Sequence, residues 1–244
     1  QIWILESDRK EDSVRFCTGI TMKHILKRSF AILLCAIMLV GAMAVMAPYK
    51  VQAATTSQNN IVARADYFYN ITWTAKSTVY GWRYNYIFDA GSTYRIPYGQ
   101  PVSTGYYIGF GVSIDEFVKA AKTSGSVFYT SRSSYSATGS SSVYYATDCS
   151  AFVSWCWGTD RKTTYSIPQI STYIGMATAS NAYSLQLGDA LNSNDVGHVV
   201  LVTDLIYSGS TLTSIEITEQ TPAKLTSLLK KEKQNEISKC EILV

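Results

Sequence analysis

Two residues of this 244-residue chain, Cys149 and His198, have the side chains and surroundings that nucleophilic acyl transfer requires. Cys149 lies in the run TDCSAFVSWCWG, residues 147–158, whose apolar positions 149, 152, 153 and 156 follow helical spacing. Asp148 is a suitable N-cap for this helix, and Gly158 is suitable for ending it. We therefore expect Cys149 in the first helical turn, where unpaired backbone N–H groups and the helix dipole stabilise a thiolate.

His198 is expected to provide the imidazole that such a cysteine needs. The chain has two histidines, and the other, His24, lies in an N-terminal segment that we interpret below as an export signal. His198 follows Gly197 and begins the run HVVLVTDLIYS, whose valine and isoleucine content predicts a strand. An imidazole beside a thiol takes its proton and returns it to a leaving group.

A third side chain is needed to orient the imidazole, and the next strand offers two candidates. Residues 197–209 and 212–220 have the pattern of a β-hairpin that turns at Ser208-Gly209. A turn centred there pairs residues whose numbers add to 417, which places Glu219 opposite His198 and on the same face. A loop one residue longer places Gln220 there instead. We favour Glu219, because a carboxylate also stabilises the imidazolium, and Gln220 is the alternative third residue.

The other cysteines predict neither a disulfide framework nor a zinc site. Cys156 follows Cys149 by a rise of about 10.5 Å along the helix, which is too far for a disulfide and favours a place in the core. Cys240 leaves an odd number of cysteines after residue 53, with no spacing typical of zinc ligands. We therefore expect no metal and no organic cofactor.

The N-terminal region has the pattern of a secretory signal. Residues 30–47 are 18 residues without a charge, with basic side chains before them and a small-residue site at 51–53 after them. We expect a signal peptide over residues 22–53, which is cleaved or, alternatively, retained as an anchor, because 18 apolar residues are at the short end of a spanning helix. Residues 1–21 precede Met22 and are interpreted as a non-native upstream segment.

The charge balance excludes one class of partner. Residues 1–53 hold 7 of the 21 Lys and Arg and 4 of the 18 Asp and Glu, which leaves 14 of each sign for residues 54–244. A neutral chain of this kind has no basic footprint for nucleic acid. After Pro222 the composition changes, because residues 224–244 carry 8 charges in 21 positions. We expect a charged tail there, either a short exposed helix or a disordered or aberrant segment.

One domain is expected between the leader and the tail, over residues 61–223. Its N-terminal part is rich in aromatic residues. Residues 55–60 have the composition of a polar lead-in, and residues 115–122 predict a helix with its cap near Ser113 or Asp115. Residues 131–146, with seven serines in sixteen positions, predict a loop.

Three segments together resemble the NlpC-type cell-wall peptidases of the papain-like superfamily: DCSAFVSWCW, the turn LGD at 187–189, and GHVVLVTD. The later EQTP resembles the related CHAP group, and the resemblance covers about residues 93–222. It implies an α+β, papain-like fold in which the helix that bears the nucleophile packs on an antiparallel β-sheet. It also implies that Tyr98, in TYRIPYGQP, lines the cleft near Cys149, and that Asp148 is a second substrate-binding residue that caps the helix.

The activity that this resemblance implies is hydrolysis of amide bonds in peptidoglycan peptides. Cys149 is then the nucleophile, His198 the general base and acid, and Glu219 the residue that orients the ring. Export places such an enzyme outside the cell or in the cell wall, and few cysteines in a secreted domain are typical of a Gram-positive bacterium. We expect a monomer that contacts the membrane only through its signal peptide. The chain departs from the family in an insertion around residues 102–146.

Two other functions are compatible with the sequence. One is a non-catalytic module that binds cell wall or glycan through exposed aromatic side chains. Candidates for such binding are Trp73, Trp82, Tyr84, Tyr86, Tyr106 and Tyr107. The other is a papain-like acyltransferase or toxin that uses the same Cys-His pair on another acyl donor.

Overall fold

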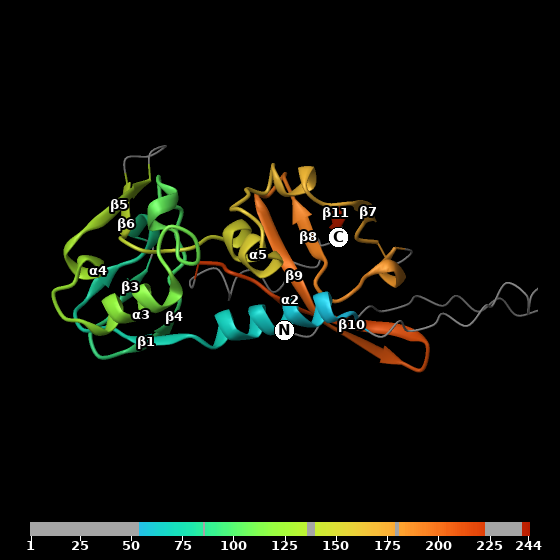
Figure 1. The fold of residues 1–244 in the computed structure, drawn as a ribbon, viewed down its shortest axis with the longest axis horizontal. Helices are drawn as coiled ribbons and strands as arrows, with labels where there is room; N and C mark the ends of the chain where they lie inside the picture. The colour runs from blue at the N-terminus through green and yellow to red at the C-terminus, as the bar shows by residue number, and fades with distance from the viewer. Residues whose placement is uncertain (1–53, 85, 136–139, 179–180, 223–240) are drawn as a thin grey trace, which may run out of the picture.

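The computed structural model describes residues 54–84, 86–135, 140–178, 181–222 and 241–244. Their elements form two lobes, and one helix lies along one lobe and leads into the other (Figure 1). The expected leader, residues 1–53, and most of the expected tail lie outside the described residues.

The helix that leads from one lobe into the other is α2 (Thr56–Asn70). It begins with a capping box, in which the Thr55 hydroxyl accepts from the Gln58 backbone N–H and the Gln58 side chain accepts from the Thr55 backbone N–H. Residues 55–60 are therefore the start of a helix, and the prediction of a polar lead-in there was wrong. α2 packs on the helix that begins at Cys149, α5 (Cys149–Trp157).

The first lobe, drawn in green in Figure 1, is made of short elements. They are β1 (Thr72–Thr74), β2 (Val79–Tyr80), η1 (Trp82–Tyr84), β3 (Ile87–Phe88), β4 (Thr93–Arg95), η2 (Thr104–Tyr106), α3 (Ile114–Lys122), α4 (Val127–Thr130), β5 (Arg132–Tyr135) and β6 (Ser140–Val143). The strands pair antiparallel as β1 with β4, β2 with β3, and β5 with β6. The expected insertion around 102–146 supplies α3, α4, β5 and β6 to this lobe.

Two local predictions for this lobe had different outcomes. The helix α3 has Ser113 as its N-cap, and a capping box with Glu116 confirms the helix start that the sequence predicted. The serine-rich segment 131–146, by contrast, is not only a loop, because β5 and β6 pair within it. Backbone hydrogen bonds pair these strands, and residues 131–146 have no alternating apolar pattern that predicts a strand.

The second lobe contains α5 and, among the described residues, a five-stranded sheet in the order β10-β9-β8-β11-β7, with all neighbours antiparallel. The strands are β7 (Tyr173–Met176), β8 (Ala190–Ser193), β9 (His198–Ser208), β10 (Thr211–Thr218) and β11 (Glu241–Leu243), and the short helices η3 (Ile167–Gln169) and η4 (Ala182–Ser184) lie in the connections. α5 packs on β9. An antiparallel sheet with a helix against it is an α+β arrangement.

The strand β9 is buried on both faces at its start. Val199 and Leu201 belong to the core cluster that includes α5, whereas Val200 and Val202 belong to a second cluster on the opposite face of the sheet. This two-sided burial explains why the sequence there is a continuous apolar run rather than an alternation. It also fixes the position of His198, because His198 is the first residue of this well-packed strand.

The end of the chain differs from the expected tail. Residues 241–243 form β11, which lies between β8 and β7 and pairs with both. Ile242 and Leu243 are fully buried. The prediction of an exposed or disordered tail is therefore wrong for these last residues, whose two apolar side chains complete the core of the sheet.

Three of the six aromatic residues that were candidates for glycan binding are core residues. Trp73, Tyr86 and Tyr107 are each at most 5% exposed, so the prediction that they form an exposed glycan-binding set was wrong. The Trp73 ring packs against Phe88 and Phe128 with centroids 5.3 Å and 5.0 Å away. Such aromatic clusters fill a small lobe that has only short strands.

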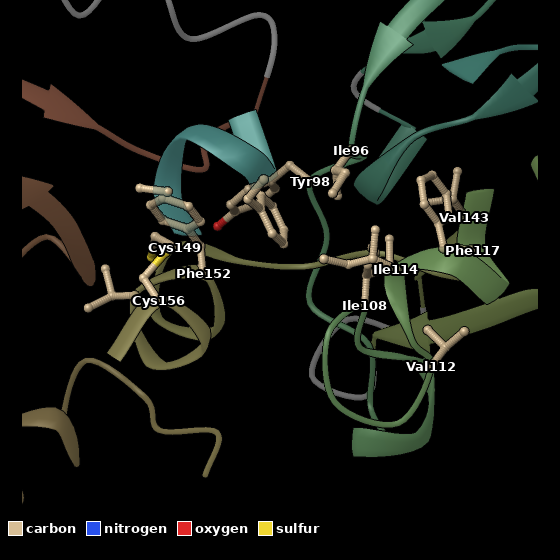
Figure 2. Close-up of a cluster of buried hydrophobic side chains, with 14 of the residues drawn as sticks. Ile96, Tyr98, Ile108, Val112, Ile114, Phe117, Val143, Cys149, Phe152 and Cys156 are labelled. Atoms are coloured by element: carbon tan, nitrogen blue, oxygen red, sulfur yellow. The ribbon is translucent and has the colours of Figure 1, made fainter. Parts of the chain in front are cut away.

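The core continues from one lobe into the other. Figure 2 shows Tyr98 between the Cys149, Phe152 and Cys156 side chains of α5 and the apolar side chains of the first lobe around Ile114. The two lobes are therefore packed together on the side of α5 that carries Cys149.

Candidate active site

Cys149 is the first residue of α5, as the sequence predicted. The Asp148 Oδ1 accepts a hydrogen bond of 2.7 Å from the Ala151 backbone N–H, and Gly158 ends the helix in the left-handed conformation with φ of 72°. Cys149 is only 2% exposed. Its thiol lies where the helix dipole and the unpaired N–H groups of the first turn favour a negative charge.

The tight connection between β8 and β9 brings His198 to Cys149. Ser193 and His198 pair at the ends of the two strands, and Gly197 turns the chain before His198 with φ of +64°. The Cys149 Sγ lies 3.9 Å from the Gly197 carbonyl oxygen. The Cys149 side chain lies close enough to the His198 ring to raise the pKa of His198. Thiol and imidazole are therefore direct neighbours.

The Glu219 carboxylate contacts the Nε2 side of the His198 ring. The His198 Nε2 and the Glu219 Oε2 are 2.7 Å apart, and the two side chains are 26% and 10% exposed. Cys149, His198 and Glu219 thus form a continuous chain of contacts from the helix start to the end of β10. A partly buried carboxylate on one ring nitrogen fixes the ring orientation and leaves the other nitrogen toward the thiol.

The surroundings of His198 also set its charge. Burial lowers the pKa of His198, but the hydrogen bonds to Cys149 and Glu219 and the negative charges of these groups outweigh burial and raise the pKa from 6.5 to about 10. The ring is therefore an imidazolium at neutral pH.

The contact between His198 and Glu219 arises from a different register than the sequence predicted. The paired residue numbers of β9 and β10 add to 419 at both ends of the hairpin instead of 417, because the turn lies one residue later, at Gly209-Ser210. Between the ends, two irregularities shift the register by one residue and back. The same register places Glu219 opposite Val200 rather than opposite His198.

The predicted contact is present in spite of this error. Glu219 lies one residue beyond the end of β10, and its Oε2 is 2.7 Å from the His198 Nε2. The alternative candidate, Gln220, projects elsewhere: its Nε2 donates to the Ile96 carbonyl oxygen at 2.9 Å. Of the two candidates, Glu219 is the one in contact with the ring.

Asp148 is part of a buried polar network. Its Oδ1 also accepts a hydrogen bond from the Ser150 hydroxyl at 2.9 Å. Its Oδ2 accepts from the Tyr107 hydroxyl at 2.9 Å and from the Arg161 Nη2 at 3.1 Å. Both carboxylate oxygens thus accept hydrogen bonds, and Asp148 lines the cleft together with Tyr107 and Arg161.

Arg161 is a cleft residue that the sequence analysis did not name, and Tyr107 was named only as a candidate for glycan binding. After Gly158 the chain turns back along α5, where the Lys162 backbone N–H donates to the Ser154 hydroxyl at 3.0 Å, and this return brings Arg161 to the helix start. The Arg161 guanidinium carbon lies 3.9 Å from the centre of the Tyr107 ring. The one sequence signal for this position of Arg161 was weak: a basic residue shortly after Gly158, the glycine that ends α5.

The Tyr98 backbone pairs with Thr147, close to Cys149 in the chain. The Tyr98 side chain does not line the open cleft. Its neighbour Gly99 donates a backbone hydrogen bond of 3.0 Å to the Thr147 carbonyl oxygen, two residues before Cys149. Tyr98 is 7% exposed, and its ring packs edge-on against Trp82 with centroids 5.2 Å apart. Burial and the nearby Cys149 and Asp148 charges raise the pKa of its hydroxyl. Tyr98 lines an apolar cavity of about 200 Å³ behind Glu219.

A cleft of about 360 Å³ lies in front of Cys149. The residues that line it are Gln100, Pro101, Val102, Tyr107, Asp148, Cys149, Ser150, Arg161, Thr163, Thr164, Tyr165 and Gly197. The first lobe supplies one wall, and the start of α5 with the returning chain after it supplies the other. Cys149 is therefore within reach of a molecule that enters this cleft.

Two further residues, Cys156 and Asp189, have structural roles. Cys156, at the other end of α5, is 1% exposed, and burial raises the pKa of its thiol. Asp189 accepts a hydrogen bond from the Gln186 backbone N–H at 2.8 Å, as expected of a turn residue. Burial raises the pKa of Asp189 to about 7 in spite of this hydrogen bond.

Within the described part of the chain, no group of three or more His, Cys, Asp or Glu side chains is arranged to hold a metal ion. In the same residues, no helix has the length and apolar character needed to cross a membrane. Comparison of the chain with family models, curated protein sequences and solved structures gave no match.

Proposed function

We propose that this protein is a secreted cysteine hydrolase that cleaves amide bonds in peptidoglycan peptides. One observation carries the proposal: the Cys149 thiol, the His198 ring and the Glu219 carboxylate are in contact in that order, and the thiol is at the start of a helix and in a cleft. This order of nucleophile, base and orienting group is the requirement for covalent acyl transfer.

In the first step Cys149, as the thiolate, attacks the carbonyl carbon of the substrate amide. The imidazolium of His198 stabilises the thiolate and then gives its proton to the leaving amine as the C–N bond breaks. The oxyanion that forms in between is placed at the start of α5, where the Cys149 backbone N–H is a suitable donor. The product of this step is a thioester on Cys149.

In the second step water resolves the thioester. His198, now neutral, takes a proton from the water, and the hydroxide attacks the thioester carbonyl, which releases the acid product and the thiolate. Glu219 keeps the Nε2 side of the ring engaged throughout, so that the other nitrogen faces Cys149 or the water.

The described arrangement also supports a papain-like fold. α5 carries the nucleophile and packs on β9, whose first residue is the base, and β10 leads to the orienting acid. Nucleophile, base and orienting group follow one another in this order along the chain, as the resemblance of the sequence motifs implies.

The choice of peptidoglycan rests on the sequence. The apolar segment at 30–47 has the pattern of an export signal, and the motifs resemble those of cell-wall peptidases. Three of the six aromatic candidates for a non-catalytic glycan-binding module, Trp73, Tyr86 and Tyr107, are buried, which weakens the support for that alternative.

The test is digestion of purified peptidoglycan by the reduced protein, with mass spectrometry of the soluble products. We expect new peptide fragments from the wild type and none from Cys149→Ala. Cys156→Ala is a matched control, because it removes the other free cysteine of α5 without touching the site. An active Cys149→Ala variant would contradict the mechanism.

A negative digest has two distinguishable meanings. If Cys149 still reacts with a thiol-specific alkylating agent, another acyl donor is the substrate, as for an acyltransferase or toxin. If Cys149 does not react, the protein is not a cysteine hydrolase, and a binding module becomes the better account.

A further inference from the structure

We propose that the cavity behind Glu219 is a binding site for a small aromatic carboxylate, a ligand with one aromatic ring and one carboxylate on a short arm. The site is separate from the cleft in front of Cys149, because the residues that line the cavity and those that line the cleft have none in common. The inference goes beyond the proposed hydrolase function and does not depend on it.

The first argument is the space that the cavity offers. Its volume is about 200 Å³. Ile96 and Tyr98, which Figure 2 shows where the two lobes meet, are among the residues that line it. An apolar cavity of about 150 Å³ in another protein takes up a benzene molecule. The cavity behind Glu219 therefore has room for a substituted benzene ring.

The second argument is the surface that such a ring meets. Phe68, Phe88 and Phe152 line the cavity, and each of them is at most 4% exposed. The lining rings already pack in pairs, with centroids 5.2 Å apart for Phe68 and Phe152 and 4.9 Å apart for Phe88 and Tyr94. A further aromatic ring makes contacts of the same kind, in which ring edges meet ring faces.

The third argument is the charge at the rim of the cavity. Two charged side chains line it, Arg95 and Glu219. The Glu219 carboxylate is already paired with His198 at 2.7 Å. Arg95 is exposed, and no carboxylate in the described part of the chain forms an ion pair with it. The rim therefore presents a positive charge that the protein itself does not neutralise.

The fourth argument is that the Arg95 guanidinium is held beside the opening. Its Nη1 donates to the Tyr69 carbonyl oxygen at 2.7 Å, and its central carbon lies 3.3 Å from the centre of the Tyr69 ring. Tyr69 also lines the cavity. Among the described residues, only this carbonyl accepts a hydrogen bond from the Arg95 side chain. The other N–H groups are therefore left to bind a carboxylate in charge-assisted hydrogen bonds.

The test uses phenylacetate and phenylacetamide, which differ only in the charged group, and follows their binding to the wild-type protein by saturation-transfer NMR. We expect phenylacetate to bind about 5-fold more tightly, the upper end for a partly exposed ion pair. Arg95→Gln should remove this preference, and Arg95→Lys should keep part of it. Acetate, which lacks the ring, should not displace phenylacetate at the same concentration.

The preference for the acid separates recognition from folding damage, because a merely distorted variant binds both ligands less well. Arg64→Gln is the matched control: Arg64 also lies over an aromatic ring, 4.5 Å from the centre of Trp155, but does not line the cavity. We expect this variant to keep the preference. An unchanged preference in Arg95→Gln overturns the inference.

A second measurement locates the ligand in the wild-type protein, so it does not depend on how a variant folds. Ile96 lines the cavity, and Val102 lines the cleft. In methyl-labelled protein the ring protons of phenylacetate should give nuclear Overhauser effects to Ile96 and none to Val102. Contacts to Val102 in place of Ile96 mean that the ligand lies in the cleft, and they overturn the inference.

The outcomes also keep this inference apart from the proposed hydrolase function. Equal binding of the two ligands, or no binding of either at millimolar concentration, overturns the inference and leaves the hydrolase proposal unchanged. Because no peptide substrate is present in these measurements, a protein that fails to digest peptidoglycan but binds phenylacetate at Ile96 retains the carboxylate site.

Discussion

The two ends of α5 carry the same residue in two different chemical settings. Cys149 and Cys156 are both almost fully buried. Cys149, however, begins the helix, touches His198 and lines a cleft, whereas Cys156 lies in the apolar core, where burial raises the pKa of its thiol. Burial alone therefore does not distinguish a reactive cysteine from a structural one. The position at the helix start and the charged partner His198 distinguish the reactive cysteine.

The largest expected effect is the loss of the nucleophile. Cys149→Ala should lower kcat by at least about 10⁴-fold, as removal of a catalytic nucleophile does in hydrolases. Cys156→Ala should leave kcat nearly unchanged and lower the free energy of unfolding by about 1 kcal/mol, a typical cost for a core substitution. Initial rates on wall peptides and thermal unfolding measure both, and similar rate losses in the two variants would remove the distinction between the cysteines.

The next effect concerns the charge on His198. Glu219→Gln should lower kcat/KM by about 100-fold or more, because the ring loses its orienting carboxylate. The wild-type pKa of about 10 means that the imidazolium persists until the pH rises toward 10. The loss of a negative neighbour lowers this pKa, so the basic limb of the pH–rate profile should move to lower pH in the variant. An unmoved limb would show that Glu219 does not act on the ring.

The same raised pKa makes a prediction for stability with a definite sign. The interactions of charged His198 stabilise the folded state fully below pH 6.5, and this contribution is lost as the pH rises through about 10. In Glu219→Gln that loss should be smaller and occur at lower pH. Urea unfolding of the two proteins between pH 6 and pH 10.5 measures the difference.

A smaller effect is expected in chemical labelling. At pH 7 iodoacetamide should alkylate Cys149 at least about 10-fold faster than Cys156, because the thiolate is the reactive form and Cys156 remains a thiol. Peptide mapping after timed quenching gives both rates in the same sample. Equal rates would mean that the position beside His198 does not activate Cys149.

The smallest effect is expected at the neighbouring position Gln220. Gln220→Ala removes one hydrogen bond to the Ile96 carbonyl oxygen, which is worth about 1 kcal/mol of stability. Its kcat/KM should stay close to the wild-type value. A loss as large as that of Glu219→Gln would transfer the orienting role to the alternative residue.

The parts of the site that the sequence predicted depend on local signals. Helical spacing with Asp148 and Gly158 at the ends located Cys149 at the helix start, and a valine-rich run after Gly197 located His198 on a strand. The His198–Glu219 contact was predicted from the wrong register, and the contact itself is present.

The parts that were missed depend on contacts between distant segments. Arg161 reaches Asp148 only because the chain turns back along α5, and β11 enters the sheet between two strands that precede it by dozens of residues. Trp73, Tyr86 and Tyr107 were expected at the surface, but they are buried in the packed core. No local pattern distinguishes these arrangements from a loop, a tail or a binding surface.

The most direct test of the central claim is the mass of the protein itself during turnover. Wild-type protein mixed with a wall peptide and quenched in acid within milliseconds should gain the mass of the acyl part of the peptide, on Cys149 and not on Cys156. An acyl group mapped to another residue, or turnover that continues undiminished in Cys149→Ala, would contradict the account.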